Sequence, residues 1–79
     1  MQIGCGVYEL MVRERRYLYF WHYETKGGRR RQIKDYVGPV DSPHTRDDAA
    51  RLCEDYYRRM AHELKRAREA SLGELRSLR

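Results

Sequence analysis

The chain has 79 residues, of which 17 are Lys or Arg and 12 are Asp or Glu, so its net charge is +5 and its pI is about 9.5. This length allows one small domain, and 41% hydrophobic with 37% charged residues excludes membrane-spanning, collagen-like and fully disordered chains. The N-terminus MQIGCGVYEL lacks a basic segment followed by a long apolar run, so we expect a cytoplasmic protein.

Strand-forming residues dominate the first 40 positions and predict three strands. Val7 to Arg13 is the first, closed by a charged turn at 14–16. Tyr17 to Thr25 is mainly aromatic and is followed by Gly27-Gly28, a turn signal. Arg29 to Val37 then returns as the hairpin partner, which gives an antiparallel sheet over residues 7–37.

A long helix is expected over residues 45–71, after a connector at 38–44 that contains two prolines. Thr45 and Asp48 form a variant of the capping box at its start. Apolar residues recur along it at three- and four-residue intervals, namely Ala49, Cys53, Tyr56, Met60, Leu64 and Ala67. Residues 72–79 continue this spacing weakly, and Gly73 favours a helical extension with a soft joint, a short second helix or a frayed tail.

These elements predict an α+β fold in which residues 1–79 form a single domain. A three-stranded antiparallel sheet packs on one long C-terminal helix in the order β-β-β-α, with an extra helical turn at the C-terminus as an option.

Nothing in the sequence indicates an enzyme, a cofactor or a metal site. Cys5 and Cys53 lie 48 positions apart with no CxxC pair, so neither a zinc site nor a disulfide scaffold is indicated, and Cys53 is interpreted as a small buried hydrophobe. His22 and Glu24 share a strand face but need not touch. The histidines have no partner at metal-ligand spacing; they are His22, His44 and His62. No GxxxxGK[ST], GxGxxG, GxSxG or HExxH motif occurs.

The length of the turn at Gly27-Gly28 decides which side chains share a face of the hairpin. An even turn places Trp21 opposite Lys34, whereas a three-residue turn would place it opposite Ile33. We favour the even turn because it gathers apolar residues on one side, where the helix covers them: Leu18 opposite Val37, and Phe20 with Ile33. The other face then carries Tyr17, Tyr19, Trp21, Tyr23 and Tyr36 together with Arg30, Gln32 and Lys34.

The positive charge is concentrated on this hairpin, because Lys26 to Lys34 alone contribute +5. Of the basic residues 14 are Arg and three are Lys, and the planar guanidinium fits phosphates and guanine edges. We therefore expect a nucleic-acid-binding protein that contacts duplex DNA. Its predicted contact residues are Tyr19, Trp21, Tyr23, Lys26, Arg29, Arg30, Arg31, Gln32 and Lys34.

Several alternatives stay open from the sequence. The aromatic row can instead be the core face, although Arg30 and Lys34 would then point towards the helix. Arg29-Arg30-Arg31 can be a solvated turn. The aromatic face can bind RNA or single-stranded DNA by stacking, or it can bind another protein.

A segment of about 25 residues resembles the N-terminal arm-type, AP2-like DNA-binding domains of tyrosine-recombinase integrases. The matching residues are Tyr17-Leu18-Tyr19, Gly27-Gly28-Arg29-Arg30-Arg31-Gln32 and Tyr36-Val37-Gly38-Pro39. The segment is also similar to strand-rich pieces of transposases and of small archaeal DNA-associated proteins. The resemblance implies a sheet that lies in the DNA major groove, with contacts from Tyr19, Trp21, Tyr23, Arg29, Arg30, Arg31, Gln32 and Lys34. The sequence has no recombinase catalytic domain, so we expect a free-standing, nucleoid-associated DNA binder.

The small size and the long helix with its trailing leucines further predict a homodimer. Double-stranded DNA is the expected partner, and no membrane association is expected.

Overall fold

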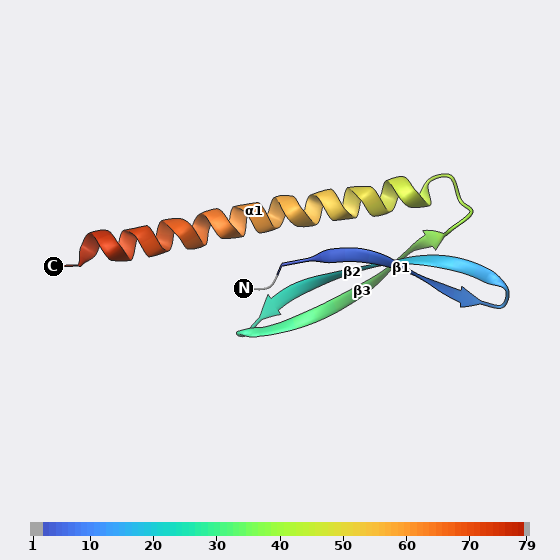
Figure 1. Ribbon diagram of the computed structural model, residues 1–79, viewed down its shortest axis with the longest axis horizontal. Coiled ribbons are helices and arrows are strands. Elements are labelled where there is room, and N and C mark those ends of the chain that lie inside the picture. Colours follow the sequence, from blue (N-terminus) through green and yellow to red (C-terminus); the bar gives the residue numbers. More distant parts are fainter. Residues whose placement is uncertain (1–2, 79) are drawn as a thin grey trace.

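The computed structural model describes residues 3–78, which form three β-strands and one α-helix (Figure 1). The strands are β1 (Cys5–Val12), β2 (Arg15–Lys26) and β3 (Arg29–Pro39), and the helix is α1 (Thr45–Ser77). The strands form one antiparallel sheet in the order β1-β2-β3. The predicted α+β class and β-β-β-α order are therefore confirmed.

Both hairpins have two-residue turns whose residues adopt positive φ. Gly27 and Gly28 have φ of 57° and 77°, a conformation that glycine adopts without a steric penalty. Arg13 and Glu14 form the first turn with φ of 50° and 67°. The predicted turn at 14–16 is wrong, because Arg15 and Arg16 already pair in β2.

The register of the second hairpin confirms the even turn, since Tyr19 pairs with Tyr36 and Trp21 with Lys34. The predicted pairing of Leu18 with Val37 is wrong. A register shift lies between Leu18 and Tyr19, so Leu18 pairs with Gly38 and β3 carries one extra residue at this point. Such a bulge bends a strand and increases its twist.

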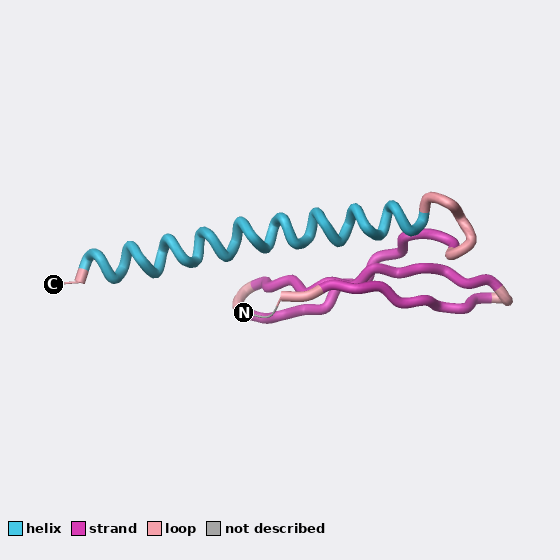
Figure 2. Tube along the Cα trace, turned by 45° about the horizontal axis from the view of Figure 1, so that its top comes forward, coloured by secondary structure: helices cyan, strands magenta, loops and turns pink. Residues whose placement is uncertain are grey.

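The helix covers one face of the sheet, as Figures 1 and 2 show. The buried hydrophobic residues of the described chain are Phe20, Ala49 and Tyr56, and Phe20 lies on the helix side of β2. Trp21, its neighbour, is on the opposite face because successive strand residues alternate. The hypothesis that the aromatic row forms the core face is thus wrong.

The connector between β3 and α1 is fixed by Thr45. Its hydroxyl donates a hydrogen bond of 2.6 Å to the carbonyl of Pro39, and the residue is buried. The predicted capping box is wrong for this reason: His44 is the N-cap residue, and its side chain makes no capping bond to any described group. A Cβ atom on Gly38 would lie 2.8 Å from Thr45 Oγ1, so this close approach requires glycine.

The C-terminal half of α1 extends beyond the sheet (orange to red in Figure 1). The helix runs through Gly73 to Ser77, further than the predicted end at 71, and Arg79 lies outside the described residues. The radius of gyration is 17.4 Å, compared with about 12 Å for a compact chain of this length. Within the described residues, α1 is not apolar enough to cross a lipid bilayer.

The apolar stripe of α1 continues along this overhang. Cys53, Leu64 and Leu75 are spaced by 11 residues, as are Tyr56, Ala67 and Leu78. Because 11 residues span three turns of a helix, Leu64, Ala67 and Leu75 lie on the face of α1 whose earlier residues, Cys53 and Tyr56, contact the sheet. Leu78 follows as the C-cap residue, with an extended backbone. Leu64, Leu75 and Leu78 are nevertheless exposed in the single chain.

Candidate nucleic-acid interface

The face of the sheet turned away from α1 carries aromatic and basic side chains from all three strands. We call it the aromatic–basic face; it comprises Tyr8, Arg15, Tyr17, Tyr19, Trp21, Tyr23, Arg30, Gln32, Lys34 and Tyr36. The two even turns create it, because each turn fixes which residues of neighbouring strands lie opposite each other, and alternate residues of a strand share a face.

The rings of this face pack against one another across the strands. Tyr8 and Tyr19 are stacked, with centroids 5.3 Å apart and planes at 15°. Tyr36 lies beside Tyr19 at 5.6 Å, and Trp21 meets Tyr23 edge-on at 5.4 Å. Cross-strand aromatic pairs of this kind stabilise a sheet that has no second layer on that side.

Cations lie over these rings. The Arg30 guanidinium is 4.9 Å from the centroid of Tyr23, and the Lys34 ammonium is 5.7 Å from that of Tyr8. No described carboxylate lies within 4 Å of either cation. Their charges are therefore directed to solvent and remain available to an anionic partner.

Two glycines near the N-terminus, Gly4 and Gly6, lie against the rings of Tyr23 and Trp21. A Cβ atom on Gly6 would lie 2.8 Å from the Trp21 indole, so the indole rests directly on the β1 backbone. Gly4 lies beneath the Tyr23 ring, where a Cβ atom would be 3.6 Å away, an ordinary contact distance. The position of Trp21 thus depends on the missing side chain of Gly6.

We expect Gly6→Ala to displace the indole of Trp21, because the new methyl group would overlap it. Since Trp21 is the single tryptophan of the chain, its fluorescence emission should shift to longer wavelength. Gly4→Ala is the matched control, because its methyl group fits beside Tyr23. An unchanged emission spectrum in Gly6→Ala would contradict this placement of Trp21.

The second hairpin ends in a basic tip. β1 begins at Cys5, opposite His22, whereas β2 and β3 continue to Lys26 and Arg29. The last residues therefore form a two-stranded ribbon with Lys26 and Arg29 beside its turn. Such a ribbon is narrow enough for the major groove of B-DNA.

Arg31 is separated from the other predicted contact residues. It pairs with Glu24, on the side of the sheet that faces α1. Tyr19, Trp21, Tyr23, Arg30, Gln32 and Lys34 share the opposite face. The structure thus brings six of the nine predicted residues together on one face. Lys26 and Arg29 flank the turn at the tip and, by strand alternation, share the side of Arg31.

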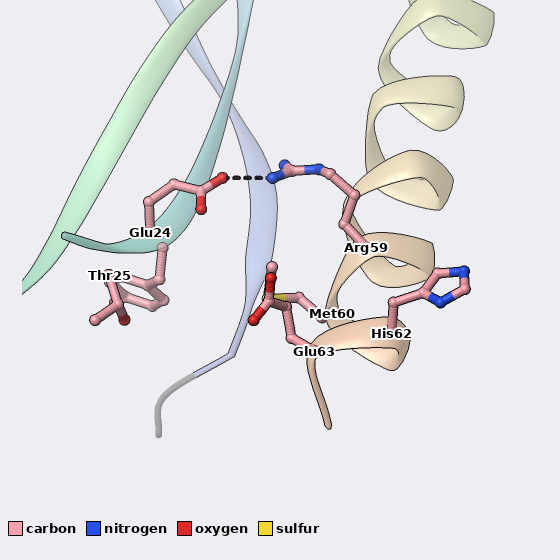
Figure 3. Close-up of a pocket in the computed structure, with 7 residues that line it drawn as sticks. Glu24, Thr25, Arg59, Met60, His62 and Glu63 are labelled. Atoms are coloured by element: carbon pink, nitrogen blue, oxygen red, sulfur yellow. Dashed lines mark hydrogen bonds and ion pairs between the residues drawn. The ribbon is translucent and has the colours of Figure 1, made fainter. Parts of the chain in front are cut away.

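The helix side of the tip contains a small pocket of about 290 Å³ between β2 and α1 (Figure 3). Arg59 reaches across it, and its Nη1 lies 3.0 Å from Glu24 Oε1. His22 Nε2 lies 3.2 Å from the same oxygen, so His22 and Glu24 do contact each other. His62 points away from Glu24 in Figure 3. Glu24 therefore connects the tip of the hairpin to the helix.

Tyr8 and Arg15 belong to the aromatic–basic face but were absent from the sequence-based set. Tyr8 stacks on Tyr19, and the Arg15 guanidinium lies 5.8 Å from the Tyr17 ring. Their placement depends on the turn at Arg13-Glu14. This pair contains neither Gly nor Asn, the residues that identify a two-residue turn with positive φ, so the register of β1 had no sequence signal.

Comparisons of the chain with protein-family models, curated proteins and solved structures gave no match. The functional assignment therefore depends on the geometry of this face and on the sequence motif.

Proposed function

We propose that the protein is a small, non-enzymatic DNA-binding protein that lays its aromatic–basic face and basic tip on duplex DNA. The observation that carries the proposal is the concentration of charge: Lys26, Arg29, Arg30 and Lys34 lie on this face or at its tip, while α1 covers the other side of the sheet. An exposed face of this composition is unusual unless it binds a partner.

The form of the hairpin supports duplex DNA as that partner. The β2–β3 ribbon extends beyond β1 and presents its cations at the end that would enter a groove. Arg30 and Lys34 would neutralise phosphates, and Gln32 has an amide that can read an adenine edge. A chromosome-associated role in the cytoplasm belongs to the same proposal.

The packing of the rings favours phosphate contacts over base stacking. Tyr8 and Tyr19 already stack on each other, and Arg30 lies over Tyr23. A base that stacked on Tyr23 would have to displace this guanidinium, whereas a phosphate would approach it directly. Single-stranded DNA and RNA are therefore weaker candidates than duplex DNA, and a purely protein partner leaves the local charge without a role.

A salt titration tests the proposal. Four phosphate contacts give a slope of log K against log salt of about −3.6 for each bound chain, and about −7.2 for a bound dimer. Affinity should therefore fall at least roughly 100-fold between about 50 and 200 mM salt. Fluorescence anisotropy of labelled duplex DNA, single-stranded DNA and RNA measures the slope for each. A nearly flat slope for the duplex, or tighter binding of single strands, would reject duplex binding through this face.

We also propose that the DNA-binding form is a homodimer. The exposed leucines of the α1 overhang continue the buried stripe, and the buried hydrophobic core of the described chain is small. Chains below about 80 residues often need association to be stable. Sedimentation equilibrium should give twice the chain mass at micromolar concentration, and Leu64→Glu combined with Leu75→Glu should give the monomer mass. A monomer mass for the unmodified chain would exclude the dimer.

A further inference from the structure

The fold brings together the two cysteines of the chain, which are 48 positions apart in the sequence. Cys5 lies at the start of β1 and Cys53 in the third turn of α1. Their Sγ atoms are 3.2 Å apart, both are free thiols, and both are half-buried. Cys53 thus occupies the predicted apolar stripe, but its sulfur contacts another sulfur.

The surroundings give a small molecule access to this pair. Cys53 lines an open groove of about 450 Å³ between the sheet and α1, together with Gly6, Phe20 and Ala49. Burial, followed by the hydrogen bond with Cys53, raises the pKa of the Cys5 thiol to about 11. Cys53 is therefore the sulfur that a reagent in the groove reaches, and Cys5 stays protonated beside it at neutral pH.

From this geometry we infer that Cys5 and Cys53 form a reversible oxidative modification site, at which a small-molecule disulfide converts the two thiols into a disulfide that links β1 to α1. This inference does not depend on DNA binding.

The reaction is an ordinary thiol–disulfide exchange in two steps. The Cys53 sulfur, after losing its proton, attacks the small disulfide RSSR; a Cys53–SR bond forms and RS⁻ leaves. Cys5 then loses its proton and attacks Cys53 Sγ, which expels the second RS⁻. The two thiol protons end on two RSH molecules, so the protein pair is oxidised by two electrons and RSSR is reduced by two.

The link requires a small displacement and closes a long loop. A disulfide has a sulfur–sulfur distance of about 2.05 Å, so the Sγ atoms must approach by a little over 1 Å from 3.2 Å. The closed loop contains the rest of β1, all of β2 and β3, and the start of α1. Loops of this length lose much conformational entropy in the unfolded chain when they are closed, so the oxidised protein should be more stable than the reduced one.

The test uses the full reduced chain and oxidised glutathione at mildly alkaline pH. We expect the mass spectrum to show the loss of two hydrogens, a peptide that joins Cys5 to Cys53, and a rise in Tm of roughly 10–20 °C. Dithiothreitol should restore the original mass and Tm. Cys5→Ser should stop at a lasting glutathione adduct on Cys53 with no such rise. Cys53→Ser should react far more slowly and also show no rise, because the raised pKa of Cys5 keeps this thiol protonated.

A second measurement does not require the variants to fold. In glutathione redox buffers, the equilibrium constant for forming the intramolecular disulfide should be at least about tenfold larger for the native chain than for the chain in urea, because the fold holds the sulfurs together. Equal constants in the two states, disulfides between two chains, or a stable glutathione adduct on the unmodified chain would each overturn the inference.

Discussion

Replacing Arg30 and Lys34 together with alanine should weaken duplex DNA binding roughly 10- to 100-fold for each bound chain and make the salt slope shallower by about 2 per chain, because each chain loses two phosphate contacts. Both side chains lie on the aromatic–basic face, over the rings of Tyr23 and Tyr8. Their removal leaves the buried side of the sheet unchanged, so the helical circular dichroism signal should be retained. Anisotropy titrations at several salt concentrations measure both effects.

The matched control is Arg51→Ala combined with Arg58→Ala. This pair removes the same charge from α1, where both side chains are about 70% exposed or more and pair with Asp48 and Asp55 one turn away. If charge alone matters, the two double variants will lose equal affinity, and the proposed interface is then wrong. If the face binds, the control should lose at most a few-fold.

Tyr56→Ala should leave the domain largely unfolded at 25 °C. Tyr56 has 1% of its surface exposed, the lowest value among the buried residues of the core. Truncating such a ring costs about 3–5 kcal/mol, and a core in a chain of this size supplies about 3–5 kcal/mol in total. A urea titration monitored by Trp21 fluorescence measures the effect, and the cooperative unfolding transition should be lost.

Tyr56→Phe isolates the hydroxyl group. This oxygen accepts a hydrogen bond from Gly4 N at 3.1 Å and donates one to Tyr23 O at 3.0 Å. It therefore bridges Gly4, which precedes β1, to Tyr23 in β2. Without it, a donor and an acceptor lose their partner, which costs about 1–3 kcal/mol. The urea midpoint should fall accordingly.

Tyr36→Phe is the control for this change, because it removes the same atom from a tyrosine that is 56% exposed. Its effect should stay within about 0.5 kcal/mol. Equal losses for the two variants would show that the Tyr56 bridge does not stabilise the fold. Folded Tyr56→Phe should still bind DNA, because its hydroxyl lies on the helix side of the sheet.

The pairing of β2 with β3 was predictable as far as Tyr19, because Gly27-Gly28 identify a two-residue turn and the turn length fixes the pairs that follow it up to the bulge. The bulge beside Tyr19 was not predictable from the turn; it lies where Gly38 packs against Thr45 of the next element. The first turn was also missed, since Arg13 and Glu14 carry no local signal for positive φ.

The end of the helix was likewise only partly predictable from the sequence. Its apolar stripe was visible as far as Ala67, and the structure extends the helix past Gly73 to Ser77. One glycine lowers helix propensity by about 1 kcal/mol relative to alanine. Good helix formers on both sides, such as Leu72 and Glu74, continue the helix through it.

By itself the sequence determined the fold class, the concentration of charge between Lys26 and Lys34, and the face shared by Trp21 and Lys34. These features depend on residue composition and on hydrophobic periodicity within one segment, which interactions between residues close in the sequence determine. The even turn also placed Arg31 opposite Glu24 on the helix side, as the structure shows. Only the tertiary structure decided that Tyr8 joins the aromatic row. It alone also brought Cys5 to 3.2 Å from Cys53. Such contacts join distant segments, and their geometry is set by the packing of whole elements, which spacing along the chain does not encode.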